Sequence, residues 1–212
     1  MKNRYYSYIR TELVNFIPEN TEKLLEIGAA SGDTLIYILE KKLASEVVGV
    51  DLIEIPESNQ QNKAISKFII ADLDKTKLEF PKKNFDVILA GDVFEHLKDP
   101  WKQLNELSVF LKDKGLIICS LPNFRNYKVL FNIVFRGDFK YAEKGILDKT
   151  HLRFFCKKNM INFFKTCGFE ILILRSNLNY GKFKFKNLFN YLTFGIFKDF
   201  LVYQYYIVAR KK

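Results

Sequence analysis

The sequence predicts an α/β fold built on a mainly parallel sheet. Short β-branched segments bounded by Gly, Asp or Pro alternate with helix-length segments through the first 120 of the 212 residues. Repeated strand–helix–strand units give right-handed crossovers and a parallel sheet. A chain of this length with 48% hydrophobic residues is sufficient for one full core, so we expect residues 1–212 to form a single domain.

Five strands are expected first, at residues 24–28, 46–51, 67–72, 85–92 and 115–122. Between them, helices are expected at 34–43, at 100–111 and, with a weaker pattern, at 59–66. Asp99 can cap the helix that begins at Pro100, because a carboxylate accepts from free backbone N–H groups and proline suits the first turn.

The pattern changes after Pro122. Residues 123–152 are polar, aromatic and irregular, and residues 157–167 predict a helix that Gly168 ends. Strands are expected at 169–176 and 201–210. The chain that joins them is too long for a hairpin turn, and we interpret 123–152 and 180–200 as insertions on the substrate side.

A glycine-rich turn follows the first strand, where doubly wound folds bind a cofactor. It contains Glu26, Gly28, Ala30, Gly32 and Asp33. A dinucleotide fingerprint would place glycine at positions 30 and 33, and an aspartate at the helix start would repel a pyrophosphate. The turn instead favours a ligand with a cationic amine and no phosphate, such as S-adenosylmethionine.

Two further aspartates end the next strands in the expected order. Asp51 ends the second strand, where a carboxylate can accept from both hydroxyls of a ribose. Asp72 ends the third, within reach of an adenine amino group. Either alone is a common surface residue, but together with the glycine turn they indicate a nucleoside site.

These residues resemble the class I S-adenosylmethionine-dependent methyltransferases over nearly the whole chain. Residues 26–32 are similar to that family's first motif, with Ala30 in place of its usual middle glycine, and FDVILAGDVFEHL is similar to its fourth. The segment GILDKTHLRFF, residues 145–155, is similar to a bacterial subgroup often associated with cell-surface glycan synthesis.

The resemblance implies a Rossmann-like, seven-stranded sheet in the order 3-2-1-4-5-7-6 with strand 7 antiparallel. It also implies S-adenosyl-L-methionine as the cofactor. The cofactor-binding positions carried over by the resemblance, or placed beside them at the strand ends, are Glu26, Gly28, Ala30, Gly32, Asp51, Leu52, Asp72, Leu73 and Asp92.

Two histidines are candidates for the base that removes an acceptor proton. His151 is preferred because an imidazole is well matched to this task at neutral pH and Asp148 is available to orient it. His96, after the fourth strand, is the second candidate, and a purely structural role remains open for each. Residues 92, 95, 96 and 148 do not by themselves specify a metal geometry, so no metal is expected.

Positive charge is concentrated in the second half of the chain. Residues 121–212 carry 18 Lys and Arg against 5 Asp and Glu, and residues 1–120 carry 16 against 19. This asymmetry favours an anionic partner. The leading hypothesis is methylation of a hydroxyl on a small molecule or glycan, which can be anionic or lipid-linked. An RNA methyltransferase and a non-catalytic cofactor- or partner-binding protein are the alternatives.

No segment has the length of apolar sequence that spans a bilayer, and the first residues lack the apolar core of a secretory signal. The expectation is therefore a cytoplasmic protein. Peripheral membrane contact through the basic, aromatic residues 180–206 stays open.

Overall fold

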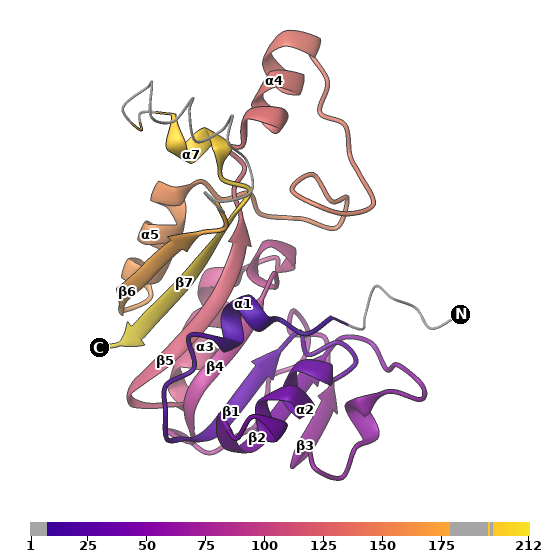
Figure 1. The fold of residues 1–212 in the computed structure, drawn as a ribbon, viewed down its shortest axis with the longest axis vertical. Coiled ribbons are helices and arrows are strands. Elements are labelled where there is room, and N and C mark those ends of the chain that lie inside the picture. Colours follow the sequence, from indigo (N-terminus) through magenta and orange to yellow (C-terminus); the bar gives the residue numbers. More distant parts are fainter. Residues whose placement is uncertain (1–7, 179–194, 196) are drawn as a thin grey trace.

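The computed structural model describes residues 8–178, 195 and 197–212 and contains a seven-stranded sheet in the order β3-β2-β1-β4-β5-β7-β6 (Figure 1). Strands β1 to β5 pair in parallel, and β7 pairs antiparallel with both β5 and β6. The strand bounds are β1 Thr21–Ile27, β2 Ala44–Asp51, β3 Lys67–Ile70, β4 Phe85–Gly91, β5 Leu111–Pro122, β6 Phe169–Ser176 and β7 Gln204–Lys211. The predicted order and the antiparallel strand 7 are confirmed.

Helices cover both faces of the sheet. Buried residues of α1 and α2 belong to one hydrophobic cluster, and those of α3 and α5 belong to the other. The helix bounds are α1 Thr11–Val14, α2 Asp33–Glu40, α3 Pro100–Phe110, α4 Tyr127–Arg136, α5 Lys157–Thr166 and α7 Lys198–Leu201. The core therefore has two layers, as a doubly wound sheet requires.

The strands alternate between these two clusters. Leu24 packs on the α1 and α2 side, whereas Leu25 and Ile27 pack on the α3 and α5 side. Because successive strand residues point to opposite faces, Glu26 shares the side of Leu24. An acidic side chain is thus buried beneath α1 and α2.

Two of the expected elements differ from the structure. Residues 59–66 contain only a short 3₁₀ turn, Asn59–Gln61, in place of the helix that their weak pattern predicted. Conversely, the segment 123–152 contains α4. Its end signals are present in the sequence, since Asn126 caps its first turn by accepting from the Lys128 N–H at 3.1 Å and Gly137 ends it at a φ of 62°.

Most of the expected insertion 180–200 lies outside the described residues, which resume with Gly195 and the short α7. Within the described part of the chain, no helix combines the length and apolar character needed to cross a membrane.

The turn after β1 has a left-handed backbone at Gly28, Ala30 and Gly32, with φ values of 71°, 46° and 81°. Glycine adopts this region readily, but a Cβ makes it costly. Ala30 therefore holds strain at the position where the resembling family usually has glycine.

We expect Ala30→Gly to raise the free energy of unfolding by about 1 kcal/mol, because it removes the Cβ from a left-handed residue. Urea denaturation of the cofactor-free protein measures this change. Ala29→Gly is the matched control: Ala29 is 95% buried and has no positive φ, so its substitution should destabilise the protein. Equal destabilisation by both substitutions would show that the turn at Ala30 is not strained.

Candidate functional site

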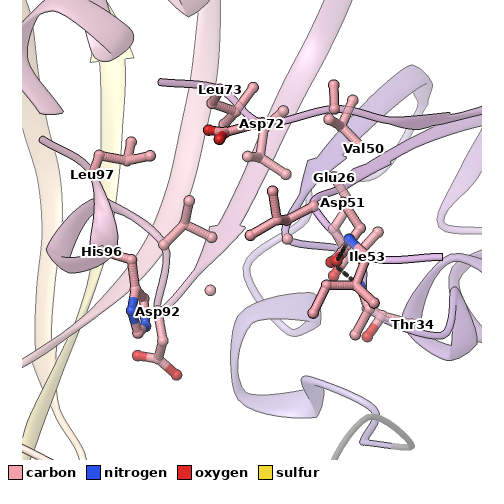
Figure 2. Close-up of a pocket in the computed structure, with 18 of the residues that line it drawn as sticks. Glu26, Thr34, Val50, Asp51, Ile53, Asp72, Leu73, Asp92, His96 and Leu97 are labelled. Atoms are coloured by element: carbon pink, nitrogen blue, oxygen red, sulfur yellow. Dashed lines mark hydrogen bonds between the residues drawn. The ribbon is translucent and has the colours of Figure 1, made fainter. Parts of the chain in front are cut away.

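A cavity of about 510 Å³ opens at the carboxyl ends of the central parallel strands (Figure 2). The residues that line it lie between 8 and 97 in the sequence. Eight of the nine predicted cofactor positions are among them: Glu26, Gly28, Ala30, Asp51, Leu52, Asp72, Leu73 and Asp92. The strand-end residues singled out by the sequence therefore meet in one cavity.

The ninth position, Gly32, does not line the cavity. It precedes α2, and a Cβ there would lie 3.1 Å from the backbone of Asn59. Asp33, which we expected near a cationic amine, is also outside the lining, and its Oδ1 accepts a 2.8 Å hydrogen bond from Asn59. Both residues support the adjoining loop.

Glu26 is the most unusual residue of the cavity. Its side chain is buried, and within the described residues neither carboxylate oxygen has a hydrogen-bond partner. Burial raises the pKa of Glu26 to about 8, although the Arg10 guanidinium opposes the shift. A buried carboxylate of this kind is completed by a cationic ligand group.

Asp51 holds the turn against the end of β2. Its Oδ2 accepts from the Ala30 N–H at 2.6 Å, and its Oδ1 accepts from the Ile53 N–H at 3.0 Å. Each oxygen keeps a second lone pair for a ligand hydroxyl. At Gly28, a Cβ would lie 2.6 Å from a side-chain carbon of Val93, so glycine is what allows Val93 to pack against this turn.

Asp72 also lines the cavity and follows β3 (Figure 2). Its carboxylate accepts from the Asp74 N–H at 3.0 Å and pairs with Lys75 at 2.8 Å. The hydrogen bond from Lys75 is the main reason why the pKa of Asp72 is lowered. The position is polar and ionised, as a nucleobase contact requires.

Tyr8 and Arg10 also line the cavity, although neither was predicted from the sequence. Arg10 pairs with Asp92 at 3.1 Å, and the other oxygen of Asp92 accepts from Ser120 at 2.8 Å and from Gln204 at 2.5 Å. No motif or spacing marks Arg10, because it reaches the site from a segment before β1. It supplies a positive charge near the buried Glu26.

His96 lines the cavity and His151 is not among its lining residues, but the centroids of the two rings are 4.6 Å apart. The expected contact of Asp148 with His151 is replaced by two others. Asp148 accepts from the Thr150 hydroxyl and N–H at 2.7 and 2.9 Å, and His151 Nδ1 donates to the Ile146 carbonyl at 3.1 Å. The backbone carbonyl, not Asp148, thus orients His151.

Thr150 connects Asp148 to the other histidine. Its hydroxyl proton is donated to Asp148, so the 3.0 Å contact between this hydroxyl and His96 Nδ1 requires the imidazole to donate. In the neutral ring, His96 Nε2 then carries the lone pair. Of the two candidates for the base, His96 is the one that lines the cavity.

The arrangement of charges fits one kind of ligand. Glu26 can accept from an ammonium group, Arg10 can pair with a carboxylate, and Asp51 can accept from a ribose diol. S-Adenosylmethionine carries all three groups. The unpartnered oxygens of Glu26 are the structural feature that such a ligand would complete.

Comparisons with known proteins agree with this geometry. A family model described as a methyltransferase domain matches residues 2–174. An uncharacterized protein of Methanocaldococcus jannaschii is 24% identical over 185 residues, which are 81% of this chain and 70% of that protein. A ubiquinone biosynthesis O-methyltransferase of Bradyrhizobium diazoefficiens is 31% identical over 50% of this chain, which spans 42% of that enzyme's length.

A solved structure supports the fold. The crystal structure of an S-adenosylmethionine-dependent methyltransferase from Archaeoglobus fulgidus superimposes with a TM-score of 0.66, at 18% identity, over 95% of this chain and 92% of that one. Together with the family model, which covers most of the chain, the comparisons identify the protein as a member of the methyltransferase-domain family and an S-adenosylmethionine-dependent methyltransferase.

Proposed function

We propose that the enzyme methylates a hydroxyl group of a small molecule or glycan. The observation that carries the proposal is the position of His96, which brings an imidazole to the cavity lined by Glu26 and Asp51. The imidazoles of His96 and His151 together promote the loss of the proton from the acceptor hydroxyl. The O-methyltransferase activity named for the Bradyrhizobium relative supports an oxygen acceptor.

We assign the cofactor contacts as follows. Glu26 binds the ammonium group, Arg10 the carboxylate, Asp51 the ribose hydroxyls, and Asp72 with Leu73 the adenine. The cofactor, when bound, supplies an electrophilic methyl group on a sulfonium, so the protein mainly has to align the acceptor and exclude water. Arg10 and Tyr8 cover the cavity from the N-terminal side.

The proposed acceptor class includes anionic and lipid-linked glycans. Most of the positive charge lies in residues 121–212, and α4 stands apart from the sheet in Figure 1. Its exposed side chains combine Phe131 and Phe135, which are 50% and 75% exposed, with the basic Lys128 and Arg136. Aromatic and basic side chains on one surface suit a lipid carrier with an anionic headgroup.

The direct test is to identify the product. Tag-free enzyme is incubated with isotopically labelled S-adenosylmethionine and a small-molecule and glycan extract, and mass spectrometry locates the label. We expect the label on an oxygen atom. His96→Gln should lower turnover by roughly 10²- to 10⁴-fold with little change in S-adenosylhomocysteine affinity, whereas Glu143→Gln, an exposed substitution, should have no effect. Label found on nitrogen, or only in an RNA fraction, would contradict the proposal.

A second prediction separates the two ends of the cofactor. Glu26→Gln and Arg10→Gln should each weaken S-adenosylhomocysteine binding by roughly 10- to 100-fold, because a charged hydrogen bond to the amino-acid part is lost. The same variants should bind 5′-methylthioadenosine, which lacks that part, like the wild type. Asp51→Asn is the control, since it should weaken both ligands. Calorimetry showing equal losses for both ligands in the Glu26 and Arg10 variants would overturn these assignments.

A third prediction follows from the raised pKa of Glu26, which is about 8 in the folded protein against an ordinary value of 4.5 for a glutamate. In the unfolded chain Glu26 ionises first, so the cofactor-free protein should lose stability as the pH rises from about 4.5 to about 8. Saturating S-adenosylhomocysteine should reduce this loss, because its ammonium pairs with the ionised carboxylate. Thermal unfolding across this pH range measures it. In the Glu26→Gln variant, we expect the change of stability with pH to be the same with and without the ligand.

A further inference from the structure

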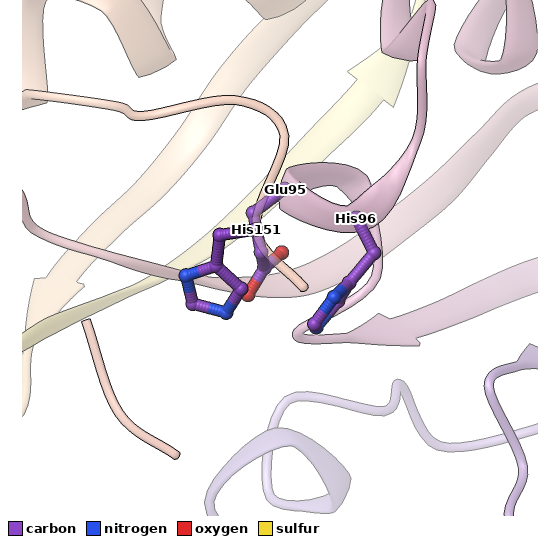
Figure 3. Close-up of side chains that lie close together, drawn as sticks. All are labelled: Glu95, His96 and His151. Carbon is purple, nitrogen blue, oxygen red and sulfur yellow. The ribbon is translucent and has the colours of Figure 1, made fainter. Parts of the chain in front are cut away.

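Three side chains with metal-binding atoms lie together beside the cofactor cavity. Glu95 and His96 belong to the short 3₁₀ turn Phe94–His96 after β4, and His151 belongs to the loop before α5. One ligand atom from each residue lies within 4.8 Å of the other two. In the view of Figure 3, the Glu95 carboxylate lies between the imidazole rings of His151 and His96.

Glu95 is a completely buried carboxyl group whose oxygens lack hydrogen-bond partners among the described residues. An isolated carboxylate in such a place costs several kcal/mol, which is why buried charges in proteins are paired or bind metals. The negative charge of the nearby Asp92 adds electrostatic repulsion to an ionised Glu95.

Both histidines are arranged as metal ligands usually are. His96 Nδ1 donates to Thr150, and His151 Nδ1 donates to the Ile146 carbonyl. These contacts fix the neutral tautomer in which Nε2 carries the lone pair. Metal-binding histidines commonly donate their second ring N–H to a carbonyl or hydroxyl partner in this way.

The backbone holds the three residues together. The main-chain carbonyl of Glu95 accepts from the Leu152 N–H at 2.8 Å and from the Arg153 N–H at 2.9 Å. The residue that precedes this pair is His151, so the loop is fixed against the turn that carries Glu95 and His96. A set of two histidines and one glutamate therefore comes from two rigidly connected segments.

We propose that Glu95, His96 and His151 bind a divalent first-row transition-metal cation, such as Zn²⁺, Mn²⁺, Fe²⁺ or Co²⁺. Two imidazoles and one carboxylate suit these ions, whereas Mg²⁺ and Ca²⁺ prefer oxygen ligands. Ligand atoms at roughly 2.0–2.2 Å from such an ion lie about 3 to 3.5 Å apart. Binding therefore draws the side chains together by on the order of 1 Å.

The site would act on the acceptor, and this part of the inference rests on the proposed function. His96 lines the cofactor cavity, so the remaining coordination positions of the ion face the acceptor. A coordinated hydroxyl has a lowered pKa and loses its proton to water more readily. The two imidazoles then act as ligands, and the oxygen is held for methyl transfer.

The test uses Co²⁺ as the probe, because its visible absorption reports nitrogen and oxygen coordination. Chelator-treated, tag-free full-length protein is titrated with Co²⁺ without cofactor or acceptor, and Zn²⁺ and Mg²⁺ are compared by competition. We expect one Co²⁺ per chain, displaced by Zn²⁺ and not by equimolar Mg²⁺. Glu95→Gln, His96→Gln and His151→Gln should each weaken binding by roughly 100-fold or more, and Glu143→Gln should bind like the wild type.

Glu95→Gln gives a second readout. It removes a buried, unpartnered carboxylate, so it should raise the melting temperature of the metal-free protein while abolishing the stabilisation by Co²⁺. If this variant does not fold, the two histidine variants decide the question. Co²⁺ binding that is absent, or unchanged in the histidine variants, would overturn the inference. Neither result would affect the identity of the methylated product, so failure of the metal site is distinguishable from failure of the proposed function.

Discussion

Parallel pairing of β1 with both β2 and β4 is the constraint on which the rest of the structure depends. It brings the carboxyl ends of these strands to one edge of the sheet, where the reversal of the strand order leaves a crevice. Glu26, Asp51 and Asp92 come from these strand ends, and all three line the same cavity. Residues far apart in the sequence are thus brought to one cavity.

The same packing buries two carboxylates that the described residues leave without partners. Glu26 lies under the turn after β1, and Glu95 lies under the turn after β4. Burial raises the pKa of both, so each is a place where the protein is destabilised in the absence of a cation. The ammonium of the cofactor and the proposed metal ion are two solutions to one physical problem. A ligand that binds such a site in the folded protein raises the free energy of unfolding and offsets this destabilisation.

The second half of the chain reaches the site at more than one place. Gln204 donates to Asp92, and the loop before α5 contacts the turn that carries Glu95 and His96. The Glu95 carbonyl accepts from Leu152 and Arg153, and His96 Nδ1 donates to Thr150. The cavity walls come from residues 8–97, while residues 121–212 hold most of the positive charge. The cavity lining and most of the positive charge therefore come from different parts of the sequence.

The sequence by itself determined the sheet, the family, and the strand ends that carry Glu26, Asp51 and Asp72. These features depend on local hydrophobic periodicity and on short spacings between residues, which can be recognised without knowing how distant segments pack. It did not predict α4, whose caps were present but whose aromatic residues obscured the helical pattern. Only the tertiary structure decided that Arg10 enters the cavity, that Gly32 does not, that Thr150 joins Asp148 to His96, and that His151 lies beside Glu95. These contacts join segments separated by tens of residues, so they depend on how the loops close over the sheet edge, which no local pattern encodes.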